Sequence, residues 1–169
     1  MQIKSFCTSD FQLECWAKMF EYDFFPTIQS LSFKKLLDDV EDYNSVCVFA
    51  NSRFAIHAIY FNEFIPDDVQ SHYVLINPVL NPFALDEFKF LKDRKGHSGY
   101  SDMFQFDSND SLILSTNERD DRVDEKFALK LAHDNADITK IFINVDKSGH
   151  SAFISDDMVR AISTTCGQR

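Results

Sequence analysis

Three polar residues, each placed just after an apolar run, have the side-chain types needed for nucleophilic hydrolysis. Ser52 follows the run that ends at Phe49, Asp120 follows a second run and His150 follows a third. A serine hydroxyl attacks a carbonyl well only when a base accepts its proton, and a carboxylate can hold that base in the required tautomer. The sequence therefore predicts a serine-type hydrolytic site, provided that the fold brings these three positions together.

Each of these residues also has an ordinary structural explanation. Ser52 could be the N-cap of the helix that follows it. Asp120 and its neighbour Asp121, the alternative acid, could be acidic residues that favour a helix N-terminus. A tight turn around a nucleophile also needs small side chains two positions on either side; Ala50 meets this need, but Phe54 does not.

Strand and helix patterns alternate along the chain, and this alternation would position the three residues. We expect strands at 2–6, 26–31, 45–49, 73–76, 112–115 and 139–145. We expect helices after Ser9, at 32–43, 54–61 and 123–133, and from a cap at Ser155 to Ile162. Strands separated by single helices predict a mostly parallel sheet covered on both faces, a three-layer αβα fold. Residues 1–169 form one expected domain, and the long connection at about 80–110 is a candidate lid.

Composition and charge narrow the classes of partner. The net charge of −10 disfavours nucleic acids and anionic membranes, because both are bound through lysine and arginine. Four widely spaced cysteines, with Cys15 and Cys47 expected to be buried, do not predict a disulfide framework. We find no metal-ligand spacing and no phosphate-binding glycine motif, and therefore expect neither a metal nor a cofactor. The first residues contain no long apolar stretch, so we expect a cytoplasmic protein without a membrane segment.

Three segments give the chain a resemblance to a known family. They are the Asn-Pro…Pro-Phe stretch at 75–83, the Leu-Ile-Leu-Ser run at 112–115 with the acidic turn behind it, and the Gly-His turn at 149–153. With them, the chain resembles the small bacterial α/β-hydrolases of the YqiA/YcfP-type esterase family. The resemblance implies a compact α/β-hydrolase fold with six strands in the order 2-1-3-4-5-6. It also implies Ser52 as nucleophile, Asp120 as acid and His150 as base.

The backbone N–H groups of Arg53 and of the loop at Cys7 and Thr8 would then stabilise the oxyanion. The function that we expect is hydrolysis of an ester or thioester of a small acyl group. The main alternative is a catalytically degenerate relative that binds a ligand or a protein, because Phe54 replaces a glycine and the first loop lacks the family's His-Gly. A receiver-like domain is disfavoured, because Cys7-Thr8 and Ala50-Asn51 stand where that class needs acids.

Overall fold

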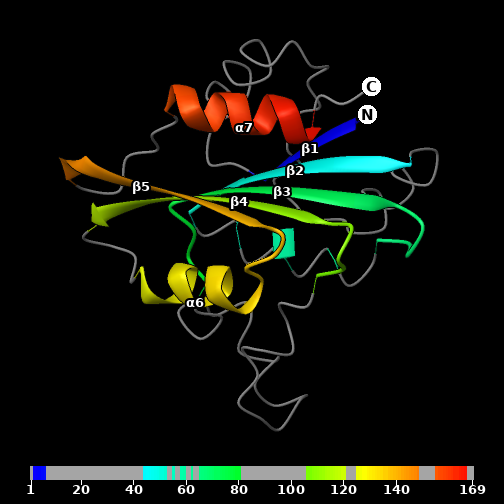
Figure 1. Cartoon of the computed structure of the whole chain (residues 1–169), viewed down its shortest axis with the longest axis horizontal. Coiled ribbons are helices and arrows are strands. Elements are labelled where there is room, and N and C mark those ends of the chain that lie inside the picture. Colours follow the sequence, from blue (N-terminus) through cyan, green and yellow to red (C-terminus); the bar gives the residue numbers. More distant parts are fainter. Residues whose placement is uncertain are drawn as a thin grey trace, which may run out of the picture.

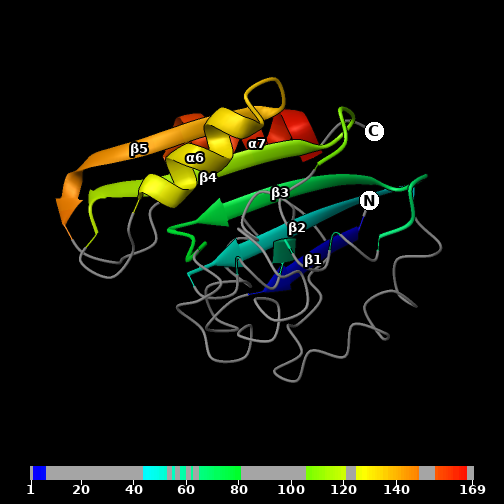
Figure 2. The ribbon, with the colours of Figure 1, turned by 90° about the horizontal axis from the view of Figure 1, so that it is seen from below.

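The structure is a computed structural model that describes residues 2–6, 44–52, 55, 58, 59, 62, 65–80, 106–120, 125–148 and 155–166. The described strands form one parallel sheet in the order β1-β2-β3-β4-β5 (Figure 1). They are β1 (Gln2–Phe6), β2 (Ser45–Asn51), β3 (Gln70–Ile76), β4 (Ser111–Arg119) and β5 (Thr139–Ser148). All four strand pairings are parallel, so the carboxyl ends lie along one edge, where the arrowheads point in Figure 2.

A helix covers each face of the sheet. Helix α6 (Lys126–Asp134) lies on one face and α7 (Asp156–Cys166) on the other, so the molecule has three layers (Figure 1). The strands carry apolar side chains on both faces, as expected of a parallel sheet covered on both sides.

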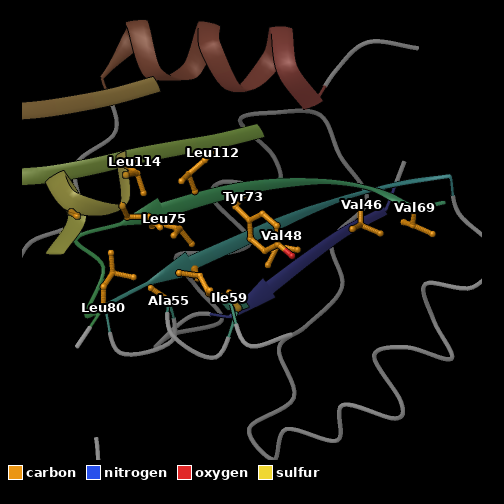
Figure 3. Packing of buried hydrophobic residues seen from close by; sticks show 14 residues of the cluster. Val46, Val48, Ala55, Ile59, Val69, Tyr73, Leu75, Leu80, Leu112 and Leu114 are labelled. Atoms are coloured by element: carbon orange, nitrogen blue, oxygen red, sulfur yellow. The ribbon is translucent and has the colours of Figure 1, made fainter. Parts of the chain in front are cut away.

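The two faces have separate apolar clusters. On the α6 face, alternate residues of β2, β3 and β4 pack around Tyr73, together with buried residues of the helical segment that follows β2 (Figure 3). The residues of this cluster labelled in Figure 3 are Val46, Val48, Ala55, Ile59, Val69, Tyr73, Leu75, Leu80, Leu112 and Leu114. On the α7 face, Met158 and Ile162 pack against the intervening strand residues.

The parallel α/β fold expected from the sequence is confirmed, and the order of the five described strands agrees with the predicted order once its second strand is left out. The predicted strand at 26–31 lies outside the described residues, as does most of the candidate lid. Strands β4 and β5 end at Arg119 and Ser148, beyond the predicted 115 and 145. The polar residues that follow each apolar run still pair through backbone groups, which hydropathy does not reveal.

Helix α7 begins as predicted. Ser155 Oγ accepts a hydrogen bond from the backbone N–H of Met158 at 3.2 Å, which is the bond that an N-cap serine makes. The helix continues to Cys166, four residues past the predicted end. Within the described part of the chain, no helix is long and apolar enough to cross a membrane.

Candidate active site

Ser52 lies immediately after β2, in a backbone conformation that is uncommon for a residue with a side chain. Its φ is 54°, in the left-handed region. Outside glycine, that region costs about 1–2 kcal/mol because Cβ approaches the following carbonyl. Tertiary hydrogen bonds hold the residue there: its N–H donates to the carbonyl of Ile76 at 3.0 Å, and its carbonyl accepts from the N–H of Val79 at 2.9 Å.

The left-handed conformation bears on the two explanations of this serine. An N-cap residue has φ and ψ in the extended region, which does not include 54°. A nucleophile at a strand-to-helix turn, in contrast, stands on a sharp and strained bend that presents its hydroxyl above the sheet. Ser52 is half-buried, and its carbonyl also accepts from the N–H of Ala55, where the helical segment begins.

Small side chains allow this turn to pack closely against the sheet. Ala50 precedes Ser52 by two positions, and Ala55 and Ala58 follow it in the helical segment; all three are fully buried in the cluster on the α6 face. The helical segment after β2 can therefore pack closely against the sheet. Phe54, the residue that the sequence marks as crowded, lies outside the described residues.

Asp120 lies two strands away from Ser52, at the end of β4. The pairing of β4 with β5 is irregular between Asn117 and Arg119, and the N–H of Asp120 then donates to the carbonyl of Asn117 at 3.2 Å. Irregularities of this kind bend a strand and turn its side chains. Strands lie about 4.8 Å apart, so β2 and β4 are separated by roughly 10 Å and a further group would have to connect the two residues.

His150, Asp121, Arg53, Cys7 and Thr8 lie outside the described residues. Strand β5 ends at Ser148, two residues before His150, on the same edge of the sheet as Ser52 and Asp120. The sheet therefore carries the chain to this edge just before each of the three predicted catalytic positions.

A group of buried polar residues at the carboxyl edge, which we term the carboxyl-edge polar band, was missed by sequence reasoning. It consists of Asn51, Asn77, Ser115, Thr116 and Asn117, all at most 6% exposed. Burial of an amide or hydroxyl is unfavourable unless it forms hydrogen bonds. The only sequence signal is that polar residues follow the apolar run of each of β2, β3 and β4.

Hydrogen bonds join this band to its surroundings. The amide of Asn144 donates from Nδ2 to Oδ1 of Asn117 at 3.2 Å, which links the ends of β4 and β5. Asn77, whose φ is 43°, donates its backbone N–H to the carbonyl of Ser115 at 2.7 Å. Both described non-glycine residues with positive φ, Ser52 and Asn77, thus adjoin one another at this edge.

The amino edge of the sheet has a different polar region, a hollow of about 330 Å³. Asp67, Asp68, Asp107 and Asp110 line it, together with polar residues at the starts of β2 and β3. Of these four aspartates, Asp110 is half-buried and the other three are exposed. Burial raises the pKa of its carboxyl, while hydrogen bonds from the N–H groups of Asp107 and Ser71, each 2.9 Å long, act in the opposite direction.

His72 lies near this edge, at the start of β3, but on the α7 face. Its Nδ1 is 2.8 Å from the hydroxyl of Ser111, and only 7% of the residue is exposed. Burial lowers the pKa of this imidazole below its usual 6.5, because the charged form loses its hydration. Its place at the opposite end of the strands separates it from Ser52.

Comparisons with known proteins show a similarity in fold and in nothing finer. No family profile matches the sequence, and no curated protein matches it. Among solved structures, the chain is similar to an esterase of Pyrococcus furiosus, PF2001, with a TM-score of 0.53 and 15% sequence identity. The similarity covers 98% of this chain and 76% of that esterase. The chain therefore shares an esterase-like α/β fold with it.

Proposed function

We propose that this protein is a serine hydrolase that cleaves esters or thioesters of small acyl groups. The observation that carries the proposal is the left-handed backbone of Ser52 at the turn between β2 and the helical segment. A strained residue persists only where its surroundings hold it, and such strain is concentrated at functional sites. The proposal includes the α/β-hydrolase fold and, as its finer form, the small bacterial esterase family that the sequence resembles.

In this mechanism, Ser52 Oγ attacks the carbonyl carbon of the substrate while His150 accepts the hydroxyl proton. Asp120 holds the imidazole in the required tautomer and stabilises its charged form. The tetrahedral oxyanion accepts hydrogen bonds from the backbone N–H groups of Arg53 and of the loop at Cys7 and Thr8. His150 then returns the proton to the departing alcohol or thiol, and water releases the acyl group in a second, equivalent cycle.

Two further observations support these roles. The expected acid, Asp120, follows an irregular strand end at the same edge as the serine. The carboxyl ends of parallel strands are also where ligands bind in open α/β sheets. The carboxyl-edge polar band places amide and hydroxyl groups beneath that edge, where they can hold the strand ends in fixed positions.

A fluorophosphonate probe tests the proposal, because it reacts covalently with activated serines. We expect the folded wild-type protein to be labelled, and labelling to disappear in both Ser52→Ala and His150→Ala. The matched control is Ser111→Ala, which removes a serine hydroxyl at the opposite end of the sheet and should leave labelling intact. Labelling that survives Ser52→Ala would contradict the assignment of the nucleophile.

A series of p-nitrophenyl esters of increasing acyl length then defines the substrate class. We expect kcat/KM to be highest for short acyl chains and to fall with Ser52→Ala by at least about 10³-fold. A folded wild-type protein that is neither labelled nor active would favour the non-catalytic binding protein instead. In that case Phe54→Gly, which restores the small residue expected after a nucleophile, is the variant to test for recovered labelling.

A further inference from the structure

Two cysteines far apart in the sequence meet on the α7 face of the sheet. Cys47 lies in the middle of β2, and Cys166 is the last residue of α7. Their sulfur atoms are 2.6 Å apart, and both residues are buried, at 0% and 1% exposure. Both are free thiols, and they belong to the same apolar cluster, with Met158 and Ile162 around them.

The two sulfur atoms lie close enough to form a covalent bond. The sulfur–sulfur separation exceeds that of a disulfide by only roughly 0.5 Å, so small side-chain rotations would bring the atoms into bonding distance. We propose that Cys47 and Cys166 form a redox site, a dithiol that closes to a disulfide by exchange with a low-molecular-weight disulfide such as oxidised glutathione.

The exchange balances without any other reactant. The thiolate of one cysteine attacks a sulfur of oxidised glutathione, which forms a mixed disulfide and releases one glutathione thiolate. The second cysteine then attacks the protein sulfur of that mixed disulfide and releases the second glutathione. The protein loses two protons and two electrons, which together are two hydrogen atoms, and oxidised glutathione becomes two molecules of reduced glutathione.

Burial makes this closure slow. The thiolate is the reacting species, and burial raises the pKa of the Cys47 thiol well above its usual value, so little thiolate is present in the closed structure. Cys166 lies in the last turn of α7, and helix ends open more readily than helix centres. Local opening of this turn is therefore the step that admits the oxidant, and the same burial protects the disulfide once it has formed.

The cross-link would join β2, which ends one residue before Ser52, to α7, which begins six residues after His150 in the sequence. Cys47 lies five residues before Ser52 on the same strand segment, and α7 follows the part of the chain that contains His150. Closure would prevent α7 from separating from the centre of the sheet. This proposal does not depend on the esterase proposal, because a dithiol can close in a protein of any function.

The test uses a Cys7→Ser/Cys15→Ser variant, which keeps only the proposed pair of the four cysteines. The folded variant is incubated with oxidised glutathione, and its thiols are counted after unfolding. We expect the count to fall from two to none, the mass to fall by two hydrogens, and the thermal midpoint to rise by roughly 5–15 °C until dithiothreitol reverses it. Closure should be several-fold faster in urea below the unfolding transition.

Peptide mapping of the oxidised wild-type protein under non-reducing conditions keeps the test decisive if the double variant does not fold. A cross-linked peptide that joins Cys47 to Cys166 supports the proposal. The single variants Cys47→Ala and Cys166→Ala are the controls, and in neither should the cross-link or the rise in midpoint occur. Two thiols that remain titratable, or that end as separate glutathione adducts, would overturn it.

Discussion

At the amino ends of β2, β3 and β4 the prominent polar groups are carboxylates around an open hollow, whereas at the carboxyl ends they are amides and hydroxyls buried beneath a turn. The amino edge therefore has the greater formal charge. The carboxyl edge has the strained backbone, with positive φ at Ser52 and Asn77. Charged side chains around the hollow thus lie at one edge of the sheet, and buried uncharged polar side chains and a strained backbone lie at the other.

The two polar regions differ in how their residues are held by the backbone. Asp110, the most buried carboxyl of the acidic hollow, accepts hydrogen bonds from two backbone N–H groups and so shapes a connection between strands. Ser52 is held by two long-range backbone hydrogen bonds, to Ile76 and Val79, in a left-handed conformation that is unfavourable for a residue with a side chain. The charged amino edge therefore has a structural role, through Asp110. The strained carboxyl edge contains Ser52, for which we propose the catalytic role.

Exchanging a carboxylate for an amide at each edge should give the largest difference in kcat between the two edges. We expect Asp120→Asn to lower kcat by about 10³–10⁴-fold, because an amide cannot hold the histidine in the productive tautomer. The matched change Asp110→Asn should alter kcat by less than about twofold, since it lies at the other end of the strands. Steady-state kinetics with a short p-nitrophenyl ester measures both.

The alternative acid provides a further control at the carboxyl edge. Asp121→Asn should lower kcat much less than Asp120→Asn. The opposite ranking would assign the role of acid to Asp121. If Asp120→Asn and Asp121→Asn were both as active as the wild type, neither aspartate would take part in catalysis.

At the amino edge the larger effect should be on stability. Asp110→Ala removes the acceptor for the N–H groups of Ser71 and Asp107, and the first of these lies in a buried residue. We expect the free energy of unfolding to fall by about 2 kcal/mol, measured by urea denaturation. Asp67→Ala, which removes an exposed carboxyl of the same hollow, should change it by less than about 0.5 kcal/mol.

The sequence indicates the sheet well, because strands buried on both faces have continuous apolar runs. Cys47 was expected to be buried, and this prediction is confirmed. The strand ends were placed too early in β4 and β5, since Asn117 and its polar neighbours lower the hydropathy of residues that still pair with the next strand. The carboxyl-edge polar band went unrecognised for the same reason.

The candidate site was predictable in its residue types but not in its geometry. The φ of Ser52 depends on partners at Ile76 and Val79, about 25 residues along the chain. The local sequence does not contain these partners, and taken alone it favours the N-cap over the strained turn. Likewise, the contact between Cys47 and Cys166 joins residues separated by 119 positions. Only the packing of α7 on the sheet brings these two together.

The strain at Ser52 can be measured directly. We expect Ser52→Gly to raise the free energy of unfolding by about 1 kcal/mol while abolishing activity, because glycine adopts positive φ without a Cβ clash. Ser52→Ala, which keeps Cβ, is the matched variant and should show no comparable gain. Equal stability of the two variants would mean that the left-handed conformation stores no strain, and would weaken the contrast between the edges.

The smallest expected effect concerns His72, which has a perturbed pKa but lies away from the candidate site. Because burial lowers its pKa in the folded protein, the unfolded chain binds the proton more readily between pH 6.5 and the lowered value. Its contribution to stability is therefore complete above pH 6.5 and is lost as the pH falls through that interval, by at most about 1.4 kcal/mol per pH unit.

Urea denaturation of the wild type and of His72→Asn over this pH interval tests the assignment. Asparagine does not titrate, so the difference in unfolding free energy between the two proteins should shrink as the pH falls. Ser163→Ala, at an exposed position of α7, removes no titratable group; it is the control and should leave the wild-type slope unchanged. If His72→Asn instead abolished ester hydrolysis while preserving stability, a residue at the amino edge would be needed for catalysis. The assignment of catalysis to the carboxyl edge alone would then be wrong.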